Sequence, residues 1–517
     1  MARGTDGLHD GEVSRRRRAA AGLIAAAASL AGARVGVQLV DGVTDPVAAV
    51  GRLVVDRAPG PAREVTIRTV GTADKPLLLL AITAVVLALG AGIGLLNRRA
   101  RISTAAALWG VGTAALVAVP GSSPAADLVV AVGAPVVGAL VLDLLLPRTA
   151  TGSYAPGRPT GPLHPKGVSR RRFLRRSAAV LSLVAAATGA GAALAAGTAR
   201  VRRTALPTAR RRAVRPAALA APAGRTPLVT TAASLYRVDT ALQTPDVDPD
   251  RWRLAISGLV ERPRTLGLAD VMAMPQVEAW ITLGCVGNEV GGDLVGTALW
   301  QGVLLSDLLR TAGVAPGATQ VVGRSVDGYT GAFPIWLALD GRDALLAVGM
   351  NGALLPREHG YPARLVVPGL YGYESAVKWL AEIELADDRY RAYWVRRGYA
   401  RSAEFRTQSR IDVPADGAAV GPGALRVAGM AWAPHRGISR VEVQVDTGPW
   451  RAARLEPDQL GVDGWRPWWA ELTPAPGEHT VAVRAVDGRG DAQPARRHGA
   501  LPDGATGHHR VRIVVAE

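Results

Sequence analysis

The single cysteine of this 517-residue chain stands in a setting that favours chemistry over packing. Cys285 directly follows a β-like run at residues 279–283 and lies between Gly284 and Gly287, which predicts a thiol on a turn at the end of a strand. Inert packing is the alternative, although a packing cysteine more often lies within an apolar run. A thiolate at such a turn suits a soft or highly covalent metal centre. Because the sequence has no second cysteine and no His–Cys cluster, a tetrahedral zinc site is not indicated.

A second group of polar residues lies between residues 355 and 379. His359 sits in a polar turn, Arg364 opens the strand-like run after it, and Lys378 ends the Gly-rich segment that follows. Arginine and lysine side chains that converge from two loops are suited to bind an anionic group such as a phosphate. Surface turn residues without a ligand are the alternative for His359 and Arg364.

The sequence around these two groups predicts two folded regions. Residues 228–405 alternate β-like runs, such as 252–256 and 364–367, with helical stretches such as 304–312, which is typical of a mixed α+β domain. Residues 406–517 are predicted to be an all-β domain, because short strand-like runs there alternate with Gly- or Pro-containing turns. This spacing favours a β-sandwich.

Five apolar runs in the first 200 residues predict a membrane region. Each is near the ~20 residues that cross a bilayer as a helix. They cover residues 19–40, 76–96, 102–119, 125–146 and 177–198. We therefore expect a four-helix transmembrane region at residues 1–150. Residues 151–227 are expected to hold a cytoplasmic loop, a fifth membrane helix and a linker rich in Arg, Ala, Pro and Thr.

Arginines set the expected orientation of this multi-pass chain in the cell membrane. The net charge of +17 comes mostly from arginines clustered beside the apolar runs, as at cytoplasmic ends of membrane helices, so nucleic acid is not an expected partner. These flanks predict a cytoplasmic N-terminus and extracytoplasmic catalytic and C-terminal domains. The segment 169–175 reads Ser-Arg-Arg-Arg-Phe-Leu-Arg and resembles a twin-arginine export signal before an apolar run.

The positions of the histidines bear on the path of electrons. A haem within a membrane bundle needs axial ligands, usually histidine. None of the eight histidines falls within the five apolar runs. We therefore predict that the chain holds no haem and exchanges electrons with a separate electron-transfer partner.

The two chemical groups resemble the sulfite oxidase superfamily of molybdopterin enzymes, and the similarity runs from about Tyr236 to the C-terminus. The resemblance implies a molybdenum–molybdopterin cofactor with Cys285 as the protein ligand of the metal. It implies that the pterin is contacted by Tyr236, Arg237, His359, Arg364, Ala376, Val377 and Lys378. The implied fold is a sulfite-oxidase-type α+β domain followed by an immunoglobulin-like β-sandwich, which often mediates formation of a homodimer.

The resemblance also implies which residues lie near the substrate. Tyr329 matches an active-site tyrosine, and Trp300 matches a tryptophan beside the substrate site. Sulfite oxidases of animals and plants follow their Cys-Ala-Gly-Asn with two arginines, whereas this chain has Glu289 after Cys-Val-Gly-Asn. A reversed charge at 4 Å changes the interaction energy by about 1 kcal/mol in water and several-fold more in a partly dry cleft. We therefore predict that sulfite is a poor substrate and that a neutral oxide, such as a sulfoxide, is a better one.

The leading interpretation is a membrane-anchored molybdenum enzyme of oxygen-atom transfer. Reduction of sulfoxides, including oxidised methionine in exported proteins, is the alternative activity. A non-catalytic cell-surface scaffold is the alternative of another class. Retention of Cys285, His359, Arg364 and Lys378 argues against the scaffold.

Overall fold

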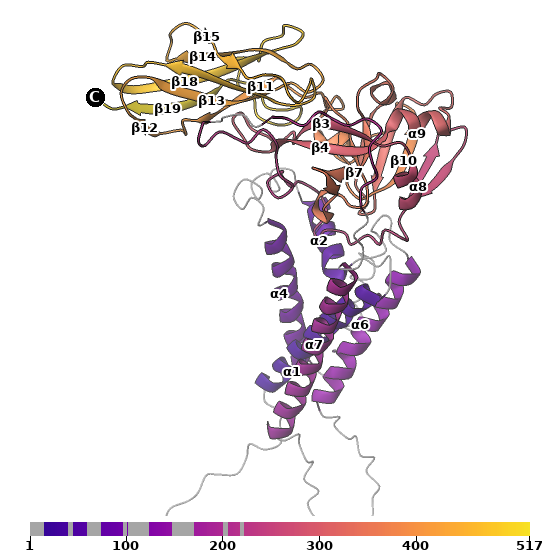
Figure 1. The fold of residues 1–517 in the computed structure, drawn as a ribbon. Helices are drawn as coiled ribbons and strands as arrows, with labels where there is room; N and C mark the ends of the chain where they lie inside the picture. Colours follow the sequence, from indigo (N-terminus) through magenta and orange to yellow (C-terminus); the bar gives the residue numbers. More distant parts are fainter. Residues whose placement is uncertain are drawn as a thin grey trace, which may run out of the picture. The chain divides into compact units, whose positions relative to one another are not determined.

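The structure is a computed structural model. It describes residues 15–39, 45–58, 74–96, 101, 124–146, 170–199, 205–217 and 222–517. The chain divides into two compact units, Met1–Arg203 and Thr204–Glu517 (Figure 1). This division falls inside the segment 151–227, where the sequence predicts a loop, a helix and a linker. The second unit contains both of the regions that the sequence predicts to fold around the chemical residues.

The unit Met1–Arg203 is helical in its described parts. Its helices are α1 (Arg15–Leu39), α2 (Pro46–Arg57), α4 (Asp74–Leu95), α6 (Pro124–Leu145) and α7 (Arg170–Ala199). Helices α1 and α4 approach closely through glycines, because a Cβ atom at Gly22 would lie 2.0 Å from the Gly90 carbonyl oxygen. Helix α2, which begins after Asp45, is not among the apolar runs predicted from the sequence. The Asp45 carboxylate accepts hydrogen bonds from two backbone N–H groups of the first turn.

Two of the described helices are long and apolar enough to cross a membrane, within Arg15–Val37 and Lys75–Leu95. By length and composition they are compatible with a membrane anchor or, near the N-terminus, with a signal sequence. Helix α6 contributes a shorter apolar stretch, Val130–Leu145, and α7 covers the predicted fifth run without meeting the same criterion. The predicted run at residues 102–119 lies outside the described residues.

Two sheets form the first part of the unit Thr204–Glu517. One sheet has the order β2 (Arg264–Gly267), β1 (Arg253–Gly258), β10 (Leu380–Ala386), β5 (Gln320–Ser325) and β6 (Thr330–Pro334). The other has the order β3 (Val277–Gly284), β4 (Val295–Leu304), β7 (Leu345–Met350) and β8 (Ala353–Leu354), and β9 (Arg364–Val366) pairs with β7. Every residue of β3 is buried, so this strand is a rigid base for the residues that follow it.

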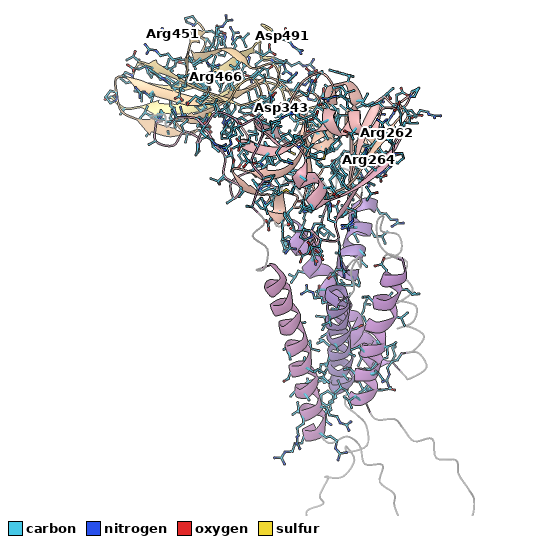
Figure 2. The ribbon with its side chains drawn as sticks, turned by 45° about the vertical axis from the view of Figure 1, so that its right-hand side comes forward. Arg262, Arg264, Asp343, Arg451, Arg466 and Asp491 are labelled. Atoms are coloured by element: carbon cyan, nitrogen blue, oxygen red, sulfur yellow. The ribbon has the colours of Figure 1, made fainter. Side chains whose placement is uncertain are left out.

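Short helices connect these strands, which gives the mixed α+β pattern that the sequence predicts. They are α8 (Leu268–Ala273), α9 (Leu305–Ala312) and α10 (Gly372–Ser375), with 3₁₀ turns η2 (Ile335–Ala338), η3 (Arg357–His359) and η4 (Val395–Arg397). Exposed arginines, Arg262 and Arg264, lie at the edge strand β2 (Figure 2). Positive charge at a sheet edge discourages pairing with a strand of another chain.

The C-terminal β region (residues 408–515) contains two further sheets, as the strand-like runs predict. One sheet has the order β11 (Gln408–Val413), β13 (Leu425–Trp432), β17 (Arg466–Leu472) and β16 (Arg454–Leu455). The other has the order β12 (Ala418–Val420), β19 (His509–Val515), β18 (Gly477–Asp487), β14 (Ile438–Val445) and β15 (Arg451–Ala452). Apolar side chains of both sheets form one core, in which Val427 and Trp468 of the first join Val481 and Ile513 of the second.

A large core cluster also crosses the predicted boundary between residues 405 and 406. Met430 and Trp432 of β13, together with Trp465, belong to the same buried cluster as Phe405 and Tyr371. All five are buried, which shows that the α+β region and the C-terminal β region pack against each other over apolar side chains. This joint core explains why the two regions form one compact unit.

Candidate active site

Cys285 is the first residue after β3, at the start of the Cys285 loop (residues 285–294), which leads to β4. The loop closes on itself, since the Cys285 N–H donates to the Leu294 carbonyl at 2.9 Å and the Asn288 N–H donates to the Cys285 carbonyl at 3.0 Å. The buried Asn288 side chain accepts from the Leu294 N–H at 2.8 Å. Cys285 is half-buried and forms no disulfide. Its predicted position at the end of a strand is confirmed.

The surroundings of the Cys285 thiol disfavour its charged form. Burial raises the pKa of the thiol, and a hydrogen bond from the Gly287 backbone acts in the opposite direction. The thiol alone is therefore a poor nucleophile, which fits a ligand better than a reactive cysteine. A metal cation bound to the sulfur reverses the balance and favours the thiolate.

His359, Arg364 and Lys378 come together as a buried cluster, as their spacing in the sequence suggests. Their exposed fractions are 3%, 4% and 8%. Gly360 lies between the last two: a Cβ atom there would be 3.0 Å from Lys378 Cβ and 3.1 Å from Arg364 Cβ. Its φ of +105° and this crowding both require glycine. His359 and Arg364 are therefore not the surface turn residues of the alternative interpretation.

Arg364 is a buried cation whose described partners carry no formal charge. Its Nη1 donates to the His359 carbonyl and its Nη2 to the Ala376 carbonyl, both at 3.1 Å. Among the described residues, no carboxylate forms an ion pair with it. Burial lowers the pKa of Arg364 to about 10, so the guanidinium stays charged at neutral pH. Because Arg364 and Lys378 share the Asp239 carboxylate, the three groups together keep an excess positive charge, which an anionic ligand would balance.

His359 is held neutral with one ring nitrogen open to a ligand. Its Nε2 lies 2.7 Å from the Ala232 carbonyl, to which it donates. Burial, followed by the charges of Arg364 and Lys378, lowers the pKa of His359 to about 4. Its Nδ1 is buried without a hydrogen-bond partner among the described residues. Buried acceptors are rarely left unsatisfied, so Nδ1 fits a donor on a bound group.

Lys378 completes the cluster and pairs with a carboxylate that was not predicted from the sequence. Its Nζ lies 2.9 Å from an Asp239 carboxylate oxygen, and both side chains are 9% exposed. No local pattern marks Asp239, which is far from Lys378 in the chain. Ala376 and Val377, which precede Lys378, contribute backbone carbonyls. The Ala376 carbonyl accepts a hydrogen bond from Arg364, and the Val377 carbonyl accepts one from the Leu365 N–H at 2.9 Å.

Tyr236 reaches the site, whereas its neighbour Arg237 does not. The Tyr236 hydroxyl oxygen lies 3.2 Å from the point where a Gly372 Cβ would be. Burial raises the pKa of Tyr236, the Cys285 charge adds to the shift, and Arg364 opposes it. Arg237 is exposed and donates to Thr244 Oγ1 at 2.9 Å. The structure therefore does not bring Arg237 into the cluster, contrary to the expectation from the resemblance.

The residues expected near the substrate divide into two accessible side chains and one buried one. Tyr329 is half-buried, and its hydroxyl donates a hydrogen bond to the Tyr373 carbonyl. Because burial raises the pKa of Tyr329 well above 10, the phenol stays protonated at neutral pH. Glu289 is exposed in the Cys285 loop. Trp300 is fully buried, with its ring 5.1 Å from the Arg364 guanidinium carbon. Direct contact of Trp300 with a substrate is therefore not supported, and its role is to pack beneath Arg364.

Glu374 is an ionisable group near Tyr329 that the sequence analysis missed. It lies in α10 and is 1% exposed. One carboxylate oxygen, Oε2, accepts from the Ala332 N–H, whereas Oε1 has no hydrogen-bond partner among the described residues. Burial raises the pKa of Glu374 to about 8, with the Ala332 hydrogen bond opposing the shift. In a substantial fraction of the molecules, Glu374 is therefore protonated at neutral pH.

Replacing Glu374 with Gln is expected to flatten the pH dependence of folding stability. Because the folded-state pKa lies above the ordinary value of 4.5, its contribution is fully present below pH 4.5 and is lost as pH rises through about 8. The wild-type chain should lose several kcal/mol between pH 5 and 9, at about 1.4 kcal/mol per pKa unit. The variant should melt at a higher temperature than wild type at pH 9. Thermal unfolding in detergent at both pH values measures this.

The matched control is Glu382→Gln, which removes a half-exposed partner of Arg324. This variant should keep the wild-type dependence of stability on pH. An unchanged pH dependence in Glu374→Gln would contradict the prediction.

Residues 241–394 match the family described as the oxidoreductase molybdopterin binding domain. The match includes His359, Arg364 and Lys378, the buried cluster with an open ring nitrogen and an excess of positive charge. The fold and the site thus define a molybdopterin-binding oxidoreductase domain.

Curated relatives extend the similarity beyond this domain. Mitochondrial sulfite oxidase of Mus musculus is 32% identical over 301 residues, which are 49% of this chain and 55% of the relative. Sulfite oxidase of Gallus gallus is 33% identical over 312 residues, 50% of this chain and 67% of the relative. The uncharacterised oxidoreductase YuiH of Bacillus subtilis (strain 168) is 37% identical over 164 residues, 31% of this chain and 79% of the relative.

The chain belongs to the sulfite oxidase superfamily of molybdopterin oxidoreductases. It is therefore an oxidoreductase enzyme with a molybdenum–molybdopterin cofactor. The chain spans about half the length of the mammalian sulfite oxidases that it matches.

Proposed function

We propose that this chain is a membrane-anchored enzyme of oxygen-atom transfer whose catalytic unit lies outside the cytoplasmic membrane. The observation that carries the enzymatic part is the arrangement around Tyr236. Its hydroxyl and the Gly284 carbonyl both lie within 4 Å of the same point at Gly372, and Gly284 immediately precedes Cys285. The Ala376 Cβ lies 3.5 Å from the same point, and the Ala376 carbonyl accepts a hydrogen bond from Arg364. A half-buried thiol and an anion-binding cluster therefore border one site.

The residues of this chain have separate roles at the proposed site. Cys285 would hold the metal, and the Arg364 and Lys378 cations would hold the anionic end of the pterin. The open Nδ1 of His359 would accept a hydrogen bond from the pterin. Tyr329 holds its proton on the phenol and orients the hydroxyl towards the Tyr373 carbonyl. When bound, the cofactor supplies the oxygen-atom and electron chemistry.

We further propose that the substrate is a neutral oxide, such as a sulfoxide, in preference to sulfite. Glu289 is exposed in the Cys285 loop, and among the described residues no cation forms an ion pair with it. A carboxylate in the loop that begins with Cys285 repels the sulfite dianion and leaves a neutral molecule nearly unaffected. Sulfoxide reduction, including that of oxidised methionine, is the activity that this charge favours.

Steady-state assays of the molybdenum-loaded chain test the substrate. The expected kcat/KM for sulfite is below the roughly 10⁴ M⁻¹s⁻¹ at which efficient enzymes begin, and Glu289→Gln should raise it about five- to tenfold. The same change should leave kcat/KM for dimethyl sulfoxide within about twofold. The exposed Asp293 of the same loop provides the matched control, because Asp293→Asn changes the net charge equally. Equal gains in both variants, or an efficient wild-type sulfite reaction, would refute this substrate assignment.

The proposed membrane topology is multi-pass. Helices α1 and α4 support it by their length and apolar composition. The arginines beside the apolar runs support a cytoplasmic N-terminus and an extracytoplasmic catalytic unit. Helix α7 begins at Arg170 within the twin-arginine-like segment, so we propose that this helix directs export of the folded unit and remains as its anchor.

Reporter fusions and one double variant test the topology. A periplasm-type reporter should be active after Glu517 and silent near Ser153. Replacement of Arg170 and Arg171 with Lys should retain the catalytic unit inside the cell, because a twin-arginine signal is read as an address rather than as charge. The control replaces Arg175 and Arg176 with Lys and should export normally. Normal export of the first double variant would reject the twin-arginine interpretation.

The remaining proposals concern domain organisation and partners. We propose a molybdopterin domain at residues 228–405, an immunoglobulin-like domain at residues 406–517 and a homodimer formed through the latter. The two sheets with one core support the immunoglobulin-like assignment. We also propose that the chain holds no haem and exchanges electrons with a separate partner, which the absence of histidine from the apolar runs of the sequence supports.

A further inference from the structure

Residues beyond position 404 contact the Cys285 loop (residues 285–294) at two points and contact Gly284, the residue before the loop, at a third. The two ends of the loop are closed by its own hydrogen bonds. Its far turn is joined by a bond from the Gly292 N–H to the Glu289 carbonyl at 2.9 Å. Two further contacts of this turn come from the C-terminal β region, and a third contact is made with Gly284 at the end of β3.

Arg410 of β11 makes the first contact. Its Nη1 donates to the Gly292 carbonyl at 2.6 Å. The guanidinium is fixed by two other partners, Asp412 at 2.7 Å and Thr226 Oγ1 at 2.8 Å, and the residue is 8% exposed. All three bonds come from one rigid planar group, so Arg410 defines where the Gly292 carbonyl lies.

His509 of β19 makes the second contact, against the neighbouring glycine. A Cβ atom at Gly291 would lie 2.2 Å from His509 Cδ2, so the imidazole occupies the space of a side chain there. The Gly291 φ of +83° adds a second reason for glycine. The ring itself is anchored, because its Nδ1 accepts from the Ile411 N–H at 3.0 Å.

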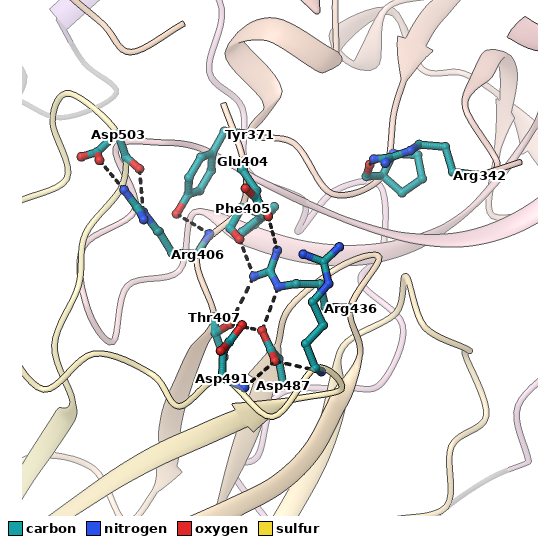
Figure 3. Close-up of polar contacts among 12 residues, drawn as sticks. Arg342, Tyr371, Glu404, Phe405, Arg406, Thr407, Arg436, Asp487, Asp491 and Asp503 are labelled. Carbon is teal, nitrogen blue, oxygen red and sulfur yellow. Dashed lines mark hydrogen bonds and ion pairs between the residues drawn. The ribbon is translucent and has the colours of Figure 1, made fainter. Parts of the chain in front are cut away.

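Phe405 makes the third contact, at the residue before Cys285. A Cβ atom at Gly284 would lie 2.2 Å from Phe405 Cζ, and the ring packs against Tyr371 at 4.4 Å between centroids. Arg436 of the C-terminal β region donates a hydrogen bond to the Phe405 carbonyl at 2.7 Å and forms an ion pair with the buried Asp487 at 2.8 Å (Figure 3). The segment that carries Phe405 is therefore fastened to the C-terminal β region.

We propose that the C-terminal β region positions the Cys285 sulfur, with Arg410 as the principal positioning residue and His509 and Phe405 as its supports. None of the three is the proposed metal ligand: Arg410 and His509 act through the backbone of the loop, and Phe405 acts through Gly284. Loss of the Arg410 contact frees the turn at residues 289–292, and the loop then samples conformations in which the thiol is more exposed. The catalytic consequence rests on the proposed role of Cys285 as the metal ligand.

Alkylation of the metal-free full-length chain measures the position of the thiol directly, because Cys285 is the only cysteine in the sequence. The rate of modification by iodoacetamide, followed by mass spectrometry, should rise at least fivefold in Arg410→Gln. Arg410→Lys should return the rate part of the way to wild type, since a lysine can still donate one hydrogen bond to the Gly292 carbonyl. An unchanged rate in Arg410→Gln would overturn the proposal.

Two further variants separate positioning from general loosening of the fold. Arg484→Gln removes the 2.7 Å ion pair with Glu442 elsewhere in the C-terminal β region, and it should leave the alkylation rate at the wild-type value. An equal rise in Arg484→Gln and Arg410→Gln would overturn the proposal. If Arg410→Gln does not fold, His509→Asn replaces it, because this change keeps an acceptor for the Ile411 N–H and removes the ring from Gly291. Its alkylation rate should also rise, and an unchanged rate would overturn the proposal.

Steady-state kinetics of the molybdenum-loaded chain test the proposed role of Cys285 as the metal ligand separately from the positioning role of Arg410. With the ligand displaced, kcat of Arg410→Gln should fall about tenfold while KM changes less than twofold. A faster alkylation with an unchanged kcat would support the positioning role and reject Cys285 as the ligand. A slower kcat with an unchanged alkylation rate would overturn the positioning role.

Discussion

Replacing Cys285 with Ala is expected to leave a folded chain that has lost its activity. The thiol is half-buried, and the loop around it is closed by backbone and Asn288 hydrogen bonds that do not involve the sulfur. The stability should therefore change by only about 1 kcal/mol. Turnover should fall by more than the roughly 10- to 100-fold loss typical of a residue that only orients a metal ligand. Some pterin should remain bound, because it has its own contacts at the buried cluster.

Elemental analysis for molybdenum and turnover on the preferred substrate measure this effect. Val286→Ala is the matched control, because it removes buried methyl groups from the adjacent position and leaves the thiol in place. The control should retain molybdenum and most of its activity in spite of a lower melting temperature. Full turnover in Cys285→Ala with any substrate would show that the sulfur is not the ligand.

Replacing Arg364 with Met is expected to remove most of the bound pterin. The guanidinium is the buried cation of the cluster, and its loss takes away the charge that an anionic ligand requires. The change also leaves the His359 and Ala376 carbonyls without their donor, at about 1–3 kcal/mol for each group that stays buried and unpaired. We expect the pterin content to fall at least tenfold and the melting temperature to fall with it.

Fluorescence of the pterin released on denaturation measures this content. Arg342→Met is the matched control, since the Arg342 side chain is 6% exposed and donates to a backbone carbonyl, that of Pro368, at 2.7 Å. Its ion pair with Asp340 means that it carries no uncompensated charge. The control should lose stability and keep its pterin. Equal loss of pterin in both variants would mean that Arg364 acts only through folding.

Local patterns predict the chemical residues well where chain neighbours determine their positions. Cys285 lies at a strand end because a β-branched run leads into glycines, and both features are visible in the sequence. His359 and Arg364 are close in the chain, so a turn followed by a strand brings them together. Gly360 lets Lys378 and Arg364 approach each other, and the Gly-rich segments of the sequence already suggest such a close approach.

Long-range contacts escape such patterns. Asp239 pairs with Lys378 across 139 positions, and nothing near Asp239 in the sequence marks it. Burial of Glu374 depends on β6, whose Ala332 supplies its hydrogen bond. Trp300 resembles a substrate-site residue in the sequence, but it lies on a strand of which nine residues are buried and only Leu304 is intermediate. The exposure of a side chain on a strand depends on what covers the sheet, and this depends on the tertiary fold.

The buried cluster shared by Phe405, Met430 and Trp432 has a consequence for how the catalytic unit denatures. Separation of the two regions at a cut between residues 405 and 406 would expose the apolar side chains that they share in this cluster, and Phe405, which packs against Gly284, would lose its hydrogen bond from Arg436. The α+β region and the C-terminal β region are thus coupled thermodynamically. They should unfold in one cooperative transition, so the metal ligand has no independent melting point.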